Sequence, residues 1–350
     1  MALDAADASG TVTSTTPGLV CGHTHLYSAL ARGMPAPRHT PRNFTEILEG
    51  VWWRVDRALD HEMLRWSAML GALEALESGT TAIVDHHSSP NAIEGSLDVI
   101  AQACADVGVR VVCCYEVTDR NGTDGAKAGL AENERFLRAG GRGIVGAHAA
   151  FTLSDETLDA VCGLAADLGV GVHVHVAEDP VDAGAGERLA PRADDRWILA
   201  HAVHLERPLP GVVVHNPRSN LNNGVGYSRP GRFPRVALGT DGIGADMLEE
   251  FRLAVALARA DDVTFSPATA WAWLAAGTSL VPEARDDEVT WSYEPADAWH
   301  LAYTTDIHPV RVEVAGETVF DEDGPTRVDA AEVRARAAEQ AARLHARLEE

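Results

Sequence analysis

Two histidines separated by one residue, His23 and His25, end an apolar run that begins after Pro17. Such a run predicts a buried strand, and alternating side chains place both imidazoles on one face near its C-terminal end. Neutral imidazoles bind zinc and other transition metals, so the pair could supply two ligands of a metal site. Surface or core histidines are the alternative, because a His-x-His pair also occurs by chance.

Two further polar side chains with suitable chemistry come from the apolar run 171–176 and the residues just after it. His175 shares a strand face with His173, and a hydrogen-bonded core histidine is the alternative interpretation for either residue. Glu178 comes three residues after His175, so its carboxylate can reach over a metal without binding it, as a general acid or base must. The run therefore predicts a ligand and a proton carrier at one strand end.

Two later strand ends carry candidate site residues of the same kind. His201 ends the run 197–201, and Asp241 ends the run 236–241. A carboxylate in an apolar strand is costly to bury unless it is paired or binds a metal. The histidines and this aspartate together give the nitrogen and oxygen ligands that zinc or ferrous iron prefers.

The elements that must position these residues are eight short apolar or β-branched runs, which mostly alternate with helix-like segments. They cover residues 19–25, 81–86, 110–116, 143–148, 171–176, 197–201, 211–215 and 236–241. This pattern predicts a closed parallel sheet, the (β/α)₈ barrel, with its active site at the C-terminal ends of the strands. Nine polar groups fall at those ends: His23, His25, His86, Glu116, His148, His175, His201, His215 and Asp241.

The connections between the strands predict where the barrel is regular and where it is reduced. Helices are expected over 61–78 and 96–107 and after Ser154, and a turn is expected over 119–125. Ten residues between His201 and Val212 are too few for a crossover helix. After Asp241 we expect shorter and looser helices.

The barrel domain is expected to cover residues 17–300, and the two ends of the chain are expected to be short extensions of it. Residues 1–16 precede it, and residues 301–350 contain a hairpin over 310–314 and 318–320 and a helix that begins near Ala330. Asp329 provides the N-cap of that helix.

Composition sets the class of protein and its compartment. The 350 residues carry a formal net charge of −23, which argues against nucleic acid and anionic membranes as partners. The odd number of cysteines, five, and their place in apolar runs predict reduced thiols in a cytoplasmic protein. We find no signal peptide and no apolar run of membrane-spanning length.

Seven motifs together resemble the metal-dependent amidohydrolase superfamily. They are PGLVCGHTH (17–25), ESGTTAIVDHH (77–87), AHAAFTLSDE (147–156), HVHVAE (173–178), AHAVHL (200–205), VVHNPRSN (213–220) and LGTDG (238–242). The chain is most similar to the aminohydrolase and deaminase branch, with SsnA-type aminohydrolases, guanine and adenosyl-type deaminases and triazine chlorohydrolases. The resemblance covers residues 17 to about 255 and is poor over the last hundred.

The resemblance implies roles for particular residues of this chain. His23, His25, His175 and Asp241 would bind one divalent metal, zinc with iron as the alternative. The catalytic set would be Glu178, which shuttles a proton, His201, which holds the attacking water, and Asp241. His148 and the HNPRSN turn (215–220), with Asn216, would line the substrate pocket. His86 is a weaker candidate, for which a structural role is favoured. Whether His201 also binds the metal stays open.

The residues themselves favour one metal over two. A two-metal site of this kind needs a bridging carbamylated lysine or a glutamate at the fourth strand end. The only lysine, Lys127, lies in a Gly-rich segment ahead of that strand, which itself ends in GAHAAF without a carboxylate.

The fold implied is a distorted (β/α)₈ TIM barrel with a reduced remnant of the small β-sandwich that the chain ends form in this family. The function implied is hydrolytic deamination of a small aminated N-heterocycle such as a purine, pterin or pyrimidine. Hydrolysis of a C–Cl bond or a cyclic amide is the first alternative, and a non-catalytic barrel scaffold is the second. The expected partner is a small-molecule substrate, and a homodimer is left open.

Overall fold

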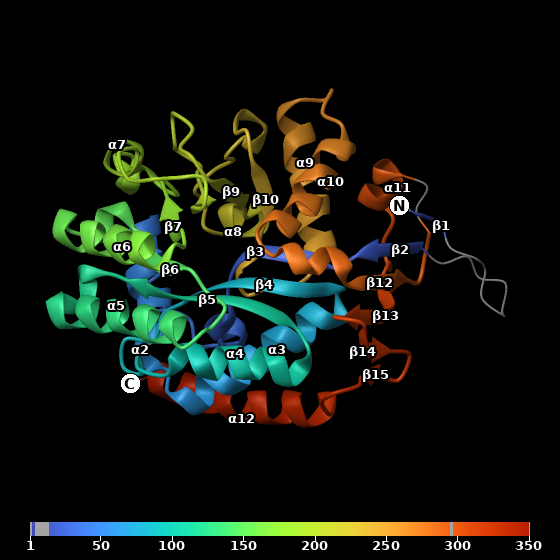
Figure 1. The fold of residues 1–350 in the computed structure, drawn as a ribbon, viewed down its shortest axis with the longest axis horizontal. Coiled ribbons are helices and arrows are strands. Elements are labelled where there is room, and N and C mark those ends of the chain that lie inside the picture. Colours follow the sequence, from blue (N-terminus) through green and yellow to red (C-terminus); the bar gives the residue numbers. More distant parts are fainter. Residues whose placement is uncertain (1, 4–13, 295–296, 350) are drawn as a thin grey trace.

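The computed structural model describes residues 2–3, 14–294 and 297–349. Most of this chain forms one barrel, and the two ends contribute to a small separate sheet and a long helix (Figure 1). Residues 4–13 of the expected extension 1–16 lie outside the described residues.

The barrel strands follow the order of the sequence and run parallel to one another. They are β3 (Leu19–His25), β4 (Thr80–His87), β5 (Arg110–Val117), β6 (Val145–Ala149), β7 (Val172–Val176), β8 (Ile198–His201), β9 (Val212–His215) and β10 (Val236–Leu238), which resumes as β11 (Asp241–Gly242). This confirms the distorted TIM barrel that the sequence predicts.

The eighth strand is broken, and its two pieces close the sheet. β10 pairs with β9, whereas β11 pairs with β3 on the other side. Between them, the Gly239 amide donates to the carbonyl of His215 and the Thr240 amide donates to the carbonyl of His23. A side chain at Gly239 would lie 2.5 Å from Oδ1 of Asn216 and 2.7 Å from the His23 carbonyl. Only glycine therefore allows this close approach.

Helices surround the sheet and leave the C-terminal strand ends open for the site. They are α1 (Phe44–Ile47), α2 (Trp53–Ala58), α3 (His61–Glu77), α4 (Ser96–Val107), α5 (Gly122–Arg138), α6 (Asp155–Leu168), α7 (Ala185–Leu189), α8 (Pro217–Asn222), α9 (Met247–Asp261), α10 (Pro267–Ala275), α11 (Ala298–Tyr303) and α12 (Ala330–Glu349). Short 3₁₀ or π turns lie between them: η1 (Leu26–Ala31), η2 (Leu48–Trp52), η3 (Asp119–Asn121), η4 (Ala150–Thr152), η5 (Pro180–Asp182), η6 (Pro230–Arg232), η7 (Ala276–Ser279) and η8 (Pro282–Asp286).

The structure corrects two expectations about these helices. The expected turn over 119–125 ends early, because α5 already begins at Gly122 and includes Lys127. The helix after Asp241, α9, has 15 residues and is not short. Asp246 caps it by accepting hydrogen bonds from the amides of Leu248 and Glu249.

Several local expectations are confirmed. Ser154 accepts a hydrogen bond from the Thr157 amide at the start of α6. The chain between β8 and β9 contains no helix within the described residues. Asp329 caps α12 through the amides of Ala331 and Glu332.

The small sheet is antiparallel and combines both ends of the chain. Its order is β1 (Ala2–Leu3), β2 (Ser14–Pro17), β12 (Glu288–Trp291), β13 (Pro309–Val314), β14 (Glu317–Asp321) and β15 (Gly324–Pro325). β13 and β14 form the predicted hairpin, and β12 joins the sheet from within the range 17–300 that we assigned to the barrel. No helix of the described chain is long and apolar enough to cross a membrane.

The helix α12, red in Figure 1, packs along the outside of α3. Its arginines pair with acidic side chains of that helix and its N-cap: Arg334 with Glu77, and Arg343 with both Asp60 and Glu62. Exposed ion pairs contribute little each, so the buried Val333, Ala337 and Leu344 face provides most of the attachment.

We expect Gly79→Ala to destabilise the junction between the barrel and the small sheet. Gly79 has a φ of +78°, and an added Cβ would lie 2.4 Å from the Trp291 ring. Gly33→Ala is the matched control, because Gly33 has a φ of +77° with nothing within 4 Å of the added carbon. Holding alanine at a positive φ lowers the free energy of unfolding by about 1–2 kcal/mol in both variants. Overpacking against Trp291 lowers it by about a further 1–3 kcal/mol in Gly79→Ala alone. Urea unfolding measures both, and equal losses would contradict the clash with Trp291.

Candidate metal centre

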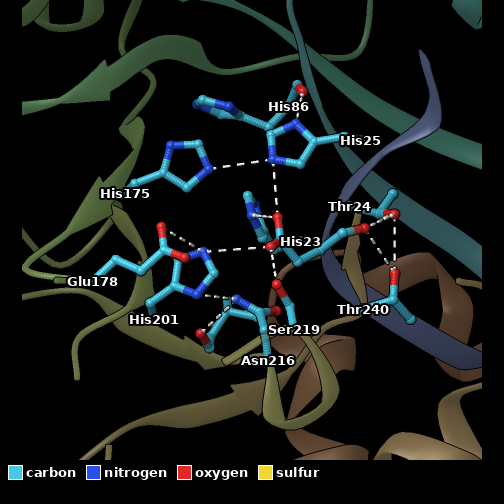
Figure 2. A network of polar contacts seen from close by, with 12 residues as sticks. His23, Thr24, His25, His86, His175, Glu178, His201, Asn216, Ser219 and Thr240 are labelled. Atoms are coloured by element: carbon cyan, nitrogen blue, oxygen red, sulfur yellow. Dashed lines mark hydrogen bonds and ion pairs between the residues drawn. The ribbon is translucent and has the colours of Figure 1, made fainter. Parts of the chain in front are cut away.

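Four side chains converge at the C-terminal ends of the strands: His23 and His25 from β3, His175 from β7 and Asp241 from β11. One ligand atom of each lies within 4.8 Å of the others, and all four residues are buried. Oδ1 of Asp241 is 3.2 Å from Nε2 of His23 and 3.0 Å from Nε2 of His25 (Figure 2). The structure thus brings together the four residues that the sequence predicts as metal ligands.

Backbone carbonyls orient two of these imidazoles. Nδ1 of His25 donates to the carbonyl of His86 at 2.5 Å, and Nδ1 of His175 donates to the carbonyl of His148 at 2.8 Å. A carbonyl can only accept, so the proton of each neutral ring lies on Nδ1. Both Nε2 atoms therefore present lone pairs to the cluster.

The donor set fits a divalent ion. The two Nε2 atoms of His25 and His175 are 3.3 Å apart, a separation that neighbouring ligand atoms around a tetrahedral zinc also have, at about 3.3 Å. Burial opposes protonation of His25, but its hydrogen bond to Asp241 and the charges of Asp241 and Glu116 together outweigh burial and raise the pKa of His25 to about 9. The surroundings of these ligand atoms therefore favour a positive charge, as a bound divalent ion would provide.

His23 is held by a residue that the sequence placed on the same strand face as His175. Its Nδ1 lies 2.9 Å from Nε2 of His173, and Nδ1 of His173 lies 3.7 Å from Sγ of Cys114. This chain of contacts leaves Nε2 of His23 directed at Asp241. His173 is thus a buried partner of a candidate ligand, a role that the sequence did not predict.

The backbone at two candidate site residues adopts the left-handed region. His201 has a φ of +70° and Asp241 has a φ of +56°. Non-glycine residues rarely adopt this conformation, and such strain is concentrated at functional sites. Hydrogen bonds hold Asp241 there: Thr24 Oγ1 donates to its carbonyl at 2.8 Å, and Ser219 donates to Oδ2.

Glu178 and His201 lie beside the cluster (Figure 2); Glu178 lines the adjoining cavity, whereas His201 is fully buried. Nε2 of His201 is 3.6 Å from Oε2 of Glu178 and 4.0 Å from Oδ2 of Asp241, and it has no hydrogen-bond partner among the described residues. Its Nδ1 donates to Oδ1 of Asn220 at 2.8 Å. Burial, reinforced by the charge of Asp241, raises the pKa of Glu178 to about 7 although His201 opposes this.

A cavity opens next to these side chains. It has an aromatic wall and a wall of polar groups, and its lining comprises His25, Tyr27, Ser28, Phe44, Leu48, Trp52, Trp53, Asp56, Glu116, His148, Ala149, Phe151, His175, Glu178, Asp179, Asp182, Asn223, Asp241 and Gly242. The placement of His148 on this wall agrees with its predicted contact with the substrate.

The other two predicted substrate contacts are placed differently. His86 and Asn216 are fully buried, and neither lines the cavity. Nε2 of His86 donates to the carbonyls of Ala147 and His173, at 3.1 and 3.2 Å, so this ring lies behind the cluster. Asn216 packs under His201, with its amide 3.4 Å from Nδ1 of that ring. These positions favour structural roles for both side chains.

No individual role was predicted for several residues that the structure places in the site. Glu116 ends β5 and lines the cavity, and the helix α8 supplies Ser219 and Asn220 with Asn223 just after it. The signal for the helix is the motif HNPRSNLNNGVG, where a proline at the first turn is followed by polar residues three and four apart.

Comparison with known proteins places the chain in a family. The sequence profile described as the Amidohydrolase family matches residues 15–278. A relative named 5'-deoxyadenosine deaminase, from Methanopyrus kandleri, is 34% identical over 273 residues, which cover 69% of this chain and 61% of the relative. A relative named 5-methylthioadenosine/S-adenosylhomocysteine deaminase, from Desulforudis audaxviator, is 31% identical over 297 residues, covering 75% and 66%. The chain thus spans about three fifths to two thirds of the length of these curated relatives.

Solved structures share the fold. A zinc-bound adenosine deaminase from Xanthomonas campestris aligns with a TM-score of 0.78 at 22% identity, over 95% of this chain and 86% of that chain. The zinc complex of atrazine chlorohydrolase TrzN, from Arthrobacter aurescens TC1, aligns with a TM-score of 0.75 at 20% identity, over 94% and 88%.

Proposed function

Because the chain belongs to the amidohydrolase family, we propose that it is a metal-dependent hydrolase that deaminates a small aminated N-heterocycle. The names of the relatives in Methanopyrus kandleri and Desulforudis audaxviator support a deaminase. The observation that carries the proposal is the position of Glu178, a buried carboxyl beside a His₃Asp cluster and on the wall of the cavity.

The metal would be held by His23, His25, His175 and Asp241, and three imidazoles with one carboxylate suit zinc. When bound, such an ion lowers the pKa of water towards ~7. Nε2 of His201 has a lone pair without a partner, so it can accept a proton from the attacking water. Oδ2 of Asp241 lies 4.0 Å from the same nitrogen, and both atoms can hold one water between them.

Glu178 would deliver a proton to the leaving nitrogen. A pKa raised to about 7 keeps part of the carboxyl population protonated at neutral pH, as proton transfer to an amine requires. The Asn223 amide donates to Oε1 at 3.4 Å and leaves Oε2 directed at the cluster. Ammonia can then depart in place of an amide anion.

The proposal is tested by measuring ammonia release from a panel of purines, pterins and pyrimidines with the zinc-loaded protein. We expect one ammonia per molecule of product for at least one substrate. Stoichiometric chloride from a chlorinated triazine, or ring opening without ammonia, would instead identify the other reactions of this family. No turnover by a protein with full metal content would favour the non-catalytic scaffold.

We expect close to one divalent ion per chain. The ligand atoms of the cluster include Nε2 of both His25 and His175, and one nitrogen lone pair binds one ion. Lys127 is exposed on α5 and cannot bridge a second ion, and β6 has no carboxylate. Elemental analysis after zinc reconstitution and desalting measures the ratio. Two tightly held ions, or none, would contradict the proposed site.

A further inference from the structure

The polar wall of the cavity contains Glu116 from the end of β5 and His148 from β6. The proposed reaction assigns no role to Glu116, although its side chain is nearly buried, with 3% of the residue exposed. Oε1 of Glu116 faces Nε2 of His148 at 3.9 Å. This distance is too long for a hydrogen bond, so both atoms are available to a ligand.

The contacts of His148 fix which of its nitrogens carries the proton. Nδ1 lies 2.7 Å from Oγ1 of Thr152, and the same hydroxyl lies 3.0 Å from the carbonyl of Ala149. The carbonyl can only accept, so the single hydroxyl proton goes to Ala149 and the oxygen accepts from Nδ1–H of His148. Nε2 of His148 is therefore a hydrogen-bond acceptor directed into the cavity.

Glu116 is an acceptor for a different reason. Burial opposes its ionisation, but the nearby Arg120 guanidinium favours the carboxylate form, whose oxygens can only accept hydrogen bonds. Oε2 faces Nδ1 of His86 at 3.3 Å, whereas Oε1 has Nη2 of Arg120 only at 3.8 Å. That guanidinium is held elsewhere, because it pairs with Asp56 and stacks over the Trp53 ring at 5.1 Å.

We propose that Glu116 and His148 form an acceptor pair that binds an N–H donor of the substrate ring. This inference rests on the proposed function and narrows its substrate class. It selects heterocycles with a ring N–H or amidine-type donor over rings whose edge carries acceptors only, such as the N1, N3 and N7 edges of adenosine.

The position of the pair relates the donor to the reacting carbon. The ligand atoms of Glu116, His25 and His86 lie within 4.8 Å of one another, and so do those of Glu116, His148 and His175. The acceptor pair is therefore about one ring width from the proposed metal site. A ring attacked at that site places its own N–H, and not a distant substituent, at Glu116.

The charge of the cavity adds a second restriction. Six carboxylates line it (Asp56, Glu116, Glu178, Asp179, Asp182 and Asp241), whereas no lysine or arginine is among its described lining residues. Even with a divalent ion, phosphate or carboxylate groups on the ligand would be repelled. The substrate is thus a neutral or cationic ring that packs against the Trp52 and Trp53 side of the cavity.

The test compares binding of guanosine and isocytosine, which carry a ring N–H, with 1-methylguanosine and adenosine, which carry none. Calorimetry on the zinc-loaded Glu178→Gln protein measures binding without turnover, so it works even where no ammonia is released. We expect guanosine or isocytosine to bind about 10–100-fold more tightly than the other two, the range for a hydrogen bond to a charged group. Equal binding of guanosine and 1-methylguanosine, or tighter binding of adenosine, would overturn the acceptor pair.

Two variants in the same background assign the preference to these residues. Glu116→Gln should reduce binding of the donor-bearing rings about 10–100-fold and leave adenosine unchanged or tighter, with unchanged zinc content. Thr152→Val removes the hydrogen-bond partner of Nδ1, so His148 can carry its proton on Nε2 instead. The difference in affinity between donor-bearing rings and adenosine should then become smaller. Loss of binding for every ring alike would indicate a merely structural role and contradict the proposal. Ammonia release without any effect of Glu116→Gln on selectivity would overturn this inference and leave the deaminase standing.

Discussion

His175→Ala should leave a folded chain that no longer retains a divalent ion. Zinc sites gain about 10–16 kcal/mol from about four ligands, so one ligand contributes roughly 3 kcal/mol, about a hundredfold in affinity. The remaining His23, His25 and Asp241 keep their mutual distances of 3.0 and 3.2 Å but lack the ligand on the β7 side. After chelator treatment and reconstitution, we expect elemental analysis to find well below one ion per chain, and turnover to fall in proportion.

The matched control is His39→Ala, because His39 is exposed and belongs neither to the ligand cluster nor to the lining of the cavity. It should retain one ion and full turnover. Circular dichroism separates loss of metal from loss of fold, because the fold is held by an extensive core around the barrel. A His175→Ala protein that held zinc as tightly as the parent would remove β7 from the metal centre.

Much of the barrel could be predicted because its strands are buried on both faces. A parallel strand covered by helices is a short continuous apolar run, and such runs end where the polar site begins. The break in the eighth strand could not be predicted in this way, because Gly239 does not differ from other strand glycines in the sequence. Its requirement for glycine comes from Asn216 and the His23 carbonyl, which pack against it in the fold. Tertiary contact, and not local pattern, produces that break.

Two helices, α5 and α9, are longer than expected, for different reasons. Glycines in 122–129 lowered the helix propensity of α5, but Gly129 is required there because a Cβ would lie 2.9 Å from the Tyr115 ring. The start of α9 did carry a signal, since Asp246 with Glu249 three residues on is a helix N-terminal pattern.

The sequence predicts the site well where a single metal-binding or acidic residue ends a strand. It predicts the site less well where one strand carries two histidines that could both be ligands. The strand pattern alone could not separate His175, whose Nε2 faces the cluster, from His173, which supports His23 from behind, and the family resemblance was needed to choose between them. It also could not assign Glu116, because the use of that carboxylate depends on its distances to His148 and Arg120. Side chains from β5 and β6 meet only once these two strands pair in the sheet.

Glu178→Gln should abolish most turnover and keep the metal. The substitution preserves size and the hydrogen bond from Asn223 but removes the acidic proton, a loss typically worth ~10²–10⁴-fold in kcat. None of the four candidate ligands changes, so zinc content should stay at about one per chain. Glu187→Gln is the matched control, since Glu187 is exposed on α7, and it should behave like the parent.

The size of the loss should depend on the leaving group. Ammonia leaves only when it is protonated, whereas chloride needs no proton, so a chlorinated substrate should be far less sensitive to Glu178→Gln than an aminated one. Stopped ammonia release together with intact zinc and intact binding of the ring would identify Glu178 as the proton donor, because a structural residue would affect all three. Near-parent ammonia release would show that another group carries the proton, and His201, 3.6 Å away, would be the next residue to test.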